Sequence, residues 1–135
     1  MLMHTPHGKI ETIPQADDIF KVVPVIYEQA RQLIEGKSLF AYMRYGCGSC
    51  QAKVDKLNMR GKERLVTIAN ERGVALVYLD IVALQFRDTL VREQQADRTA
   101  SSFILYYMGN AIRRHDGFPF ADDLADWIEQ HFPVQ

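Results

Sequence analysis

The chain has 135 residues, a length typical of one domain and sufficient to bury a core without disulfides or metals. Hydrophobic residues make up 47% of the chain, and 16 basic residues nearly balance 17 acidic ones, which argues against a nucleic-acid or anionic-membrane binder. No apolar run approaches the roughly 20 residues of a membrane helix, and the first residues lack a signal-peptide pattern, so we expect a cytoplasmic protein.

The first part of the chain predicts a short strand followed by helix. Lys9–Ile13 alternates weakly and ends at a proline, which suits an edge strand. A helical pattern begins at Asp17-Asp18 and runs to Ile34, although Pro24 breaks or restarts it. Gly36 then supplies the stop of this helix.

The middle of the chain predicts a buried strand that leads into a long helix. Ser38–Met43 is mostly apolar without alternation, which indicates a strand covered on both faces. From Cys50 onward apolar residues recur at steps of three and four until Gly73, as on the buried side of a helix. Gly61 weakens this helix by about 1 kcal/mol relative to alanine, so we expect a kink near residues 58–61.

The last part of the chain predicts three more strands of the same sheet and two more helices. A second buried strand covers Val74–Val82, and a weaker helix follows over Ala83–Gln95. The remaining elements are a strand at Ser102–Tyr107, a turn at Gly109-Asn110, a returning strand at Ala111–His115, and a helix that Gly117-Phe118-Pro119 opens.

The order of these elements predicts one α/β domain over residues 1–135, with residues 1–8 loosely ordered. Strands that alternate with helices imply parallel pairing with right-handed crossovers, and the hairpin adds antiparallel strands to the same sheet. We therefore expect a central mixed sheet of four to five strands, flanked by about four helices.

The two cysteines, Cys47 and Cys50, lie at the predicted junction of strand and helix. Unpaired N–H groups and the helix dipole favour negative charge at a helix N-terminus, so a thiol there has a lowered pKa. Cys47, expected at the N-cap, would attack a substrate disulfide as a thiolate, and Cys50, one turn into the helix, would resolve the mixed disulfide.

Two other interpretations of this pair remain open. The cysteines can be inert residues that meet at this spacing by chance. They can also form half of a metal site, although zinc usually needs four ligands and none of the four histidines shows ligand spacing. The strand before the pair and the helix after it favour redox chemistry over both.

The sequence resembles the thioredoxin-like superfamily over nearly its whole length. The resemblance rests on Cys47-Gly48-Ser49-Cys50 after a buried strand, and on Gly109 and Gly117, whose spacing matches two glycines of the thioredoxin tail. It implies a thioredoxin-like fold. It also implies that a set of residues around the cysteines contacts the substrate: Gly46, Gly48, Ser49, Ser101 and Gly117.

The chain departs from the thioredoxin pattern at several of these positions. Ser101 stands where thioredoxins have a cis-proline facing the cysteines, and Gly46 replaces a tryptophan. Ala41 and Tyr78 stand where the family has a buried aspartate and a lysine. Both members of that pair are missing together, which avoids a single buried charge.

The resemblance implies a thiol–disulfide oxidoreductase that needs no bound cofactor and no metal. Its partners would be a disulfide-containing protein or small disulfide as substrate, and a reductase or thiol pool as electron donor. The departures keep two alternatives open. One is a thioredoxin-like protein-binding module without catalysis, and the other is a variant that binds a metal or an iron–sulfur cluster through Cys47 and Cys50.

Overall fold

The computed structural model describes residues 2–4, 10–12, 19–24, 26–43, 50–80, 87–94 and 101–134. Its central sheet has the strand order β4-β3-β5-β6, in which β3 is parallel to β4 and antiparallel to β5. The strands are β3 (Lys37–Met43), β4 (Ala75–Asp80), β5 (Ser102–Tyr107) and β6 (Asn110–Asp116). The helices are α1 (Tyr27–Glu35), α2 (Cys50–Met59), α3 (Lys62–Arg72), α4 (Arg87–Gln94) and α5 (Ala121–His131).

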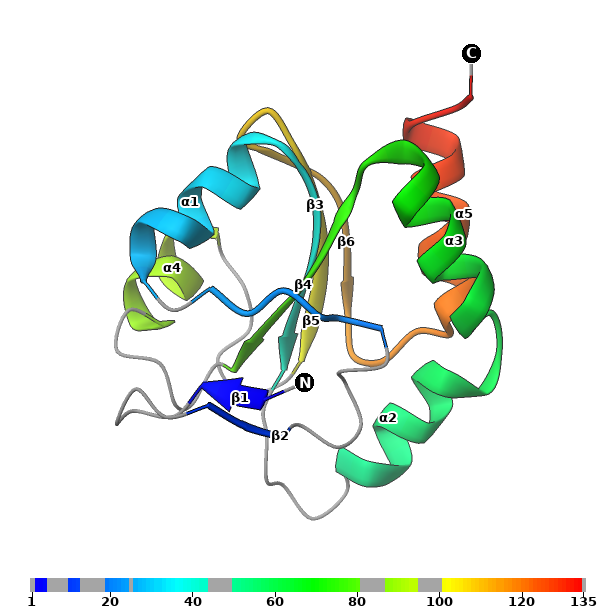
Figure 1. Ribbon diagram of the computed structural model, residues 1–135, viewed down its shortest axis with the longest axis horizontal. Helices are drawn as coiled ribbons and strands as arrows, with labels where there is room; N and C mark the ends of the chain where they lie inside the picture. Colours follow the sequence, from blue (N-terminus) through cyan, green and yellow to red (C-terminus); the bar gives the residue numbers. More distant parts are fainter. Residues whose placement is uncertain are drawn as a thin grey trace.

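The helices cover both faces of this sheet, with α1 and α4 on one side and α3 and α5 on the other (Figure 1). Side chains of β3 alternate between the two layers, as a strand requires. Leu39 and Ala41 pack toward α3 and α5, whereas Phe40 and Tyr42 pack toward α1 and α4. All four are fully buried, which explains the unbroken apolar run in the sequence.

The segment before α1 differs from the prediction. Asp17 and Asp18 lie outside the described residues, and residues 19–24 are not helical. Val22 instead extends the sheet by one parallel bridge at the outer edge of β4. Its N–H donates to the carbonyl of Leu76 at 3.2 Å, and its carbonyl accepts from the N–H of Tyr78 at 2.9 Å.

The strand predicted at Lys9–Ile13 exists as β2 (Ile10–Thr12), but it does not belong to the central sheet. It pairs antiparallel with β1 (Leu2–His4) in a separate two-stranded sheet. We predicted no element at residues 2–4, which fall in the stretch expected to be loosely ordered. Their partner β2 begins only six residues after β1 ends, but three residues are too few to show the alternation by which a strand is predicted.

The long helix expected between Cys50 and Gly73 is divided into α2 and α3. The division falls at Arg60 and Gly61, close to the expected kink. Gly61 has φ of 83°, a left-handed conformation that glycine adopts without a steric penalty. The change is therefore a full break with reorientation, since no α-helix continues through that conformation.

The hairpin between β5 and β6 turns one residue earlier than predicted. Its central residues are Met108 and Gly109, with φ of 53° and 88°, so both have the positive φ of a type I′ turn. Asn110 is already the first residue of β6. After β6, Pro119 precedes α5 and is not part of its first turn, because Phe120 is the N-cap residue.

Candidate functional site

Most of the predicted site lies outside the described residues. This applies to Gly46, Cys47, Gly48 and Ser49, so the N-cap position expected for Cys47 stays a prediction. Cys50 is the first described residue of α2, and Ser101 and Gly117 are both described.

The strand register brings the elements next to these residues together at one edge of the sheet, namely the edge at which β3 and β4 end and β5 begins. At this edge β3 ends at Met43, beside the last residue of β4, Asp80. Ser102, the first residue of β5, pairs with Tyr42 on one side and with Asp116, the last residue of β6, on the other. In the sequence, the cysteine motif stands between Met43, where β3 ends, and the start of α2, whose first described residue is Cys50. Carboxyl ends of parallel strands are the usual location of sites in α/β sheets.

Ser101 and Gly117 are in direct contact across this edge. The N–H of Gly117 donates to the carbonyl oxygen of Ser101 at 2.7 Å. Gly117 has φ of 92°, which explains why a glycine stands there. Ser101 is buried, with 6% of its surface exposed. Two residues predicted from the resemblance are thus joined by a short backbone hydrogen bond.

Ala41 and Tyr78, at the positions of the family's buried ion pair, are register partners between β3 and β4. Ala41 is fully buried and Tyr78 is 2% exposed, and both belong to the layer under α3 and α5. Alanine and tyrosine stand here in place of both members of the ion pair, so no charge lacks its counterion. A single charge without its counterion would be costly at such a buried position.

Helix α2 is held on its C-terminal side by a contact that the sequence pattern did not reveal. The Arg60 guanidinium lies over the ring of Phe120 at 4.1 Å, and Lys56 Nζ lies 5.1 Å from the same ring. Such cation–π contacts contribute about 0.5–1 kcal/mol each at exposed sites. A contact between residues so distant in sequence leaves no signal in the local pattern.

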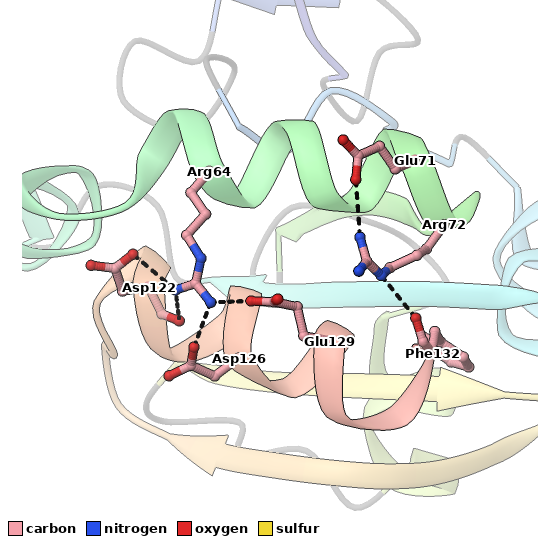
Figure 2. Close-up of polar contacts among 7 residues, drawn as sticks. All are labelled: Arg64, Glu71, Arg72, Asp122, Asp126, Glu129 and Phe132. Atoms are coloured by element: carbon pink, nitrogen blue, oxygen red, sulfur yellow. Dashed lines mark hydrogen bonds and ion pairs between the residues drawn. The ribbon is translucent and has the colours of Figure 1, made fainter. Parts of the chain in front are cut away.

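Helices α3 and α5 are joined by a cluster of charges centred on Arg64 (Figure 2). Its guanidinium contacts Asp122 at 3.1 Å, Asp126 at 2.7 Å, and Glu129. These three carboxylates raise the pKa of Arg64, and the hydrogen bond that Arg64 donates to Asp126 is the largest cause. At the other end of the helix pair, Arg72 Nε donates to the carbonyl of Phe132 at 2.8 Å (Figure 2). Both contacts fix α5 beside α3.

Two negative findings concern the described part of the chain only. None of its helices is long and apolar enough to cross a bilayer. None of its described side chains forms a group of three or more histidine, cysteine, aspartate or glutamate residues suited to a metal ion.

Solved structures of thioredoxins are similar to this chain over most of its length. A thioredoxin variant from Halobacterium salinarum has a TM-score of 0.61 at 17% identity, covering 84% of this chain and 92% of its own. The thioredoxin of Malassezia sympodialis has a TM-score of 0.61 at 20% identity, covering 81% and 88%. Thioredoxin f2 of Chlamydomonas reinhardtii has a TM-score of 0.56 at 19% identity, covering 84% and 98%.

These similarities establish the fold class. The chain has a thioredoxin-like α/β fold, as the resemblance in the sequence implied. No protein-family model matches the sequence, and no curated protein matches it either. At identities of 20% or less the structural similarity defines the fold, and the chemistry has to be argued from the residues of this chain.

Proposed function

We propose that this chain is a thiol–disulfide oxidoreductase in which Cys47 is the nucleophile and Cys50 the resolving thiol. The observation that carries the proposal is the position of the motif within the fold. Cys47-Gly48-Ser49-Cys50 follows the central strand β3 and ends at Cys50, the first described residue of α2. In a thioredoxin-like fold this is the location where a helix N-terminus favours a thiolate.

The proposed reaction conserves atoms and electrons. The Cys47 thiolate attacks one sulfur of the substrate disulfide, the substrate S–S bond breaks, and the other substrate sulfur leaves as a thiolate that takes up a proton. The Cys50 thiolate then attacks the Cys47 sulfur and releases the second substrate thiol. The substrate gains two electrons and two protons, and the protein becomes a Cys47–Cys50 disulfide. A reductase or a thiol pool returns the two electrons.

The substrate class is a disulfide-containing protein or a small disulfide. Ser101 and Gly117 support this choice because they lie beside the end of β3, the strand that precedes the cysteine motif in the sequence. A serine keeps a backbone N–H where a proline has none, so Ser101 carries a backbone donor as well as a backbone acceptor. Its carbonyl already accepts the Gly117 N–H, and a carbonyl oxygen has a second lone pair.

The proposal is tested by dithiothreitol-driven reduction of a protein disulfide. We expect wild type to accelerate the reduction and Cys47→Ser to abolish the acceleration, whereas Cys50→Ser accumulates a mixed disulfide with the substrate. The double variant Cys47→Ser/Cys50→Ser serves as the thiol-free control, since the chain has no other cysteine. Equal rates for all four proteins would refute the assignment.

A second candidate is a thioredoxin-like protein-binding module. Its support is the paired Ala41 and Tyr78, which leave this buried position without the charged groups of thioredoxins. The redox couple discriminates the two functions. A Cys47–Cys50 disulfide that forms reversibly in glutathione buffers supports the enzyme, and a pair that never forms one supports the module. Visible absorbance of protein purified without oxygen would instead indicate an iron–sulfur cluster.

A further inference from the structure

The junction between α2 and α3 is docked onto the start of α5. The N–H of Asp122, in the first turn of α5, donates to the carbonyl of Arg60 at 3.1 Å. The carbonyl of the next residue, Gly61, accepts the N–H of Leu65 at 2.8 Å and so begins α3. The carbonyl of Arg60 therefore bonds to α5, and the carbonyl of Gly61 makes the first hydrogen bond of α3.

Gly61 is required by this contact for two independent reasons. Its φ of 83° is one that residues with a side chain rarely adopt. A Cβ at this position would also lie 2.5 Å from both the backbone nitrogen and Cγ of Asp122, closer than real Cβ contacts come. Because part of the obstruction is backbone, a side chain at position 61 must push α5 and the junction apart.

Asp122 cannot yield easily, because other residues hold it in place. Arg64 Nη1 donates to its carboxylate at 3.1 Å and to its carbonyl at 3.3 Å. The neighbouring Phe120 lies under the guanidinium of Arg60 and near Lys56 Nζ, so it contacts the last turn of α2 and the junction. The start of α5 thus holds the cysteine-bearing helix from its far end.

The same short segment holds the other half of the candidate site. Residues 117–122 begin with Gly117, whose N–H donates to the carbonyl of Ser101 at 2.7 Å. They end with Asp122, which binds the junction through Arg60. Ser101 and the helix that carries Cys50 are therefore both attached to one segment of six residues, which we call the 117–122 clamp.

We infer that the 117–122 clamp is a positioning element that sets α2 relative to Ser101, and that Gly61, Phe120 and Asp122 are positioning residues for the cysteine chemistry. The inference rests on the proposed function. None of these residues needs to touch substrate. They act by orienting α2, because the orientation of α2 sets the direction of its dipole relative to the cysteine motif.

The test compares Gly61→Ala with Gly73→Ala. Gly73 also has a positive φ, 66°, and also flanks α3, but a Cβ there meets nothing within 4 Å. The two variants therefore carry similar backbone strain, and only Gly61→Ala disturbs the clamp. The readouts are the pH midpoint of Cys47 alkylation, measured in Cys50→Ser backgrounds, and the equilibrium of the cysteine couple with glutathione.

We expect Gly61→Ala to change the glutathione equilibrium constant by about threefold or more and to shift the alkylation midpoint, while Gly73→Ala changes neither. A second pair of variants covers the case in which Gly61→Ala does not fold. Phe120→Leu removes the ring under Arg60 and Lys56. Phe132→Leu removes a ring at the other end of α5 that lies 5.3 Å from Lys37 Nζ. Only Phe120→Leu is expected to shift the midpoint.

The failure of the two ideas is distinguishable. A wild-type Cys47 with an ordinary thiol midpoint, about 8.5, contradicts the proposed function and removes the inference that rests on it. A second outcome overturns the positioning role alone. In it the wild-type midpoint is lowered, but Gly61→Ala and Gly73→Ala have the same alkylation midpoint, and so do Phe120→Leu and Phe132→Leu.

Discussion

The hydroxyl groups of Tyr42 and Tyr106 lie 2.6 Å apart and share a hydrogen bond inside the layer between the sheet and α1. Both side chains are fully buried, and Tyr106 also packs edge-on against Phe40. Each hydroxyl is therefore the partner that offsets the cost of burying the other, which is the condition under which a buried polar pair is tolerated.

We predict that the two tyrosines are energetically coupled. Tyr42→Phe or Tyr106→Phe alone should lower the free energy of unfolding by about 1–3 kcal/mol, because each leaves a buried hydroxyl without this partner. The double variant should lose less than the sum of the two. Urea unfolding of all four proteins measures the coupling, and the exposed Tyr107→Phe is the control, expected within about 0.5 kcal/mol of wild type. Strictly additive losses would contradict the pairing.

The same pair predicts a loss of stability at alkaline pH. Burial is the main cause that raises the pKa of Tyr42 and of Tyr106 well above the ordinary value of 10.0. The folded state therefore keeps protons that the unfolded state releases. The contribution of these protonated tyrosines to the free energy of unfolding is fully present below about pH 10. It falls as the pH rises further, by at most about 1.4 kcal/mol per pH unit for each tyrosine. The free energy of unfolding lost between about pH 9 and pH 11 should be smaller in Tyr42→Phe than in wild type. An equal loss in Tyr42→Phe and wild type would contradict this prediction.

Restoring the family's buried aspartate alone should destabilise the protein. Ala41→Asp places a carboxylate at a fully buried position beside Tyr78, where the thioredoxins have a lysine. We expect a loss of about 3–5 kcal/mol in the free energy of unfolding, the cost of an uncompensated buried charge. Ala111→Asp, on the exposed strand β6, is the control and should cost no more than about 1 kcal/mol. Similar costs for both variants would contradict the burial of Ala41.

The Arg64 cluster predicts a salt-dependent contribution to stability. Arg64→Gln leaves three carboxylates of α5 close together without their shared cation. Because the groups are partly exposed, we expect a loss of about 1 kcal/mol at low salt, shrinking in concentrated salt. Arg31→Gln removes one exposed pair with Glu35 and should change stability by less than about 0.5 kcal/mol. A loss for Arg64→Gln that is insensitive to salt would exclude an electrostatic origin.

Buried strands were the part of this fold that sequence alone predicted best. Ser102–Tyr107 forms β5 with the predicted bounds, since its apolar run is closed by polar residues and a turn. The turn itself was displaced by one residue because Met108 adopts a positive φ that its side chain disfavours. The glycine that follows and the pairing of the strands determine the turn, and the strand pairing is a tertiary property.

The errors share a cause, which is dependence on contacts between distant residues. Val22 is extended because β4 offers it a partner in Leu76 and Tyr78, and this overrides a local pattern that looked helical. Gly61 is visible in the sequence as a weak point, but its left-handed φ and the hydrogen bond from the Asp122 N–H to the neighbouring Arg60 carbonyl are not. For the candidate site, the cysteine motif and its strand are visible locally, whereas the attachment of α2 to Phe120 is not.

The most direct measurement is the intact mass of the protein after brief exposure to glutathione disulfide. We predict that Cys50→Ser retains one glutathione adduct, located on Cys47 by peptide mapping. Wild type should instead pass through that adduct to an internal Cys47–Cys50 disulfide. Cys47→Ser should react far more slowly at the same pH. Adducts that form equally on either cysteine, or that persist in wild type with no internal disulfide, would contradict a nucleophile and a resolving thiol at these positions.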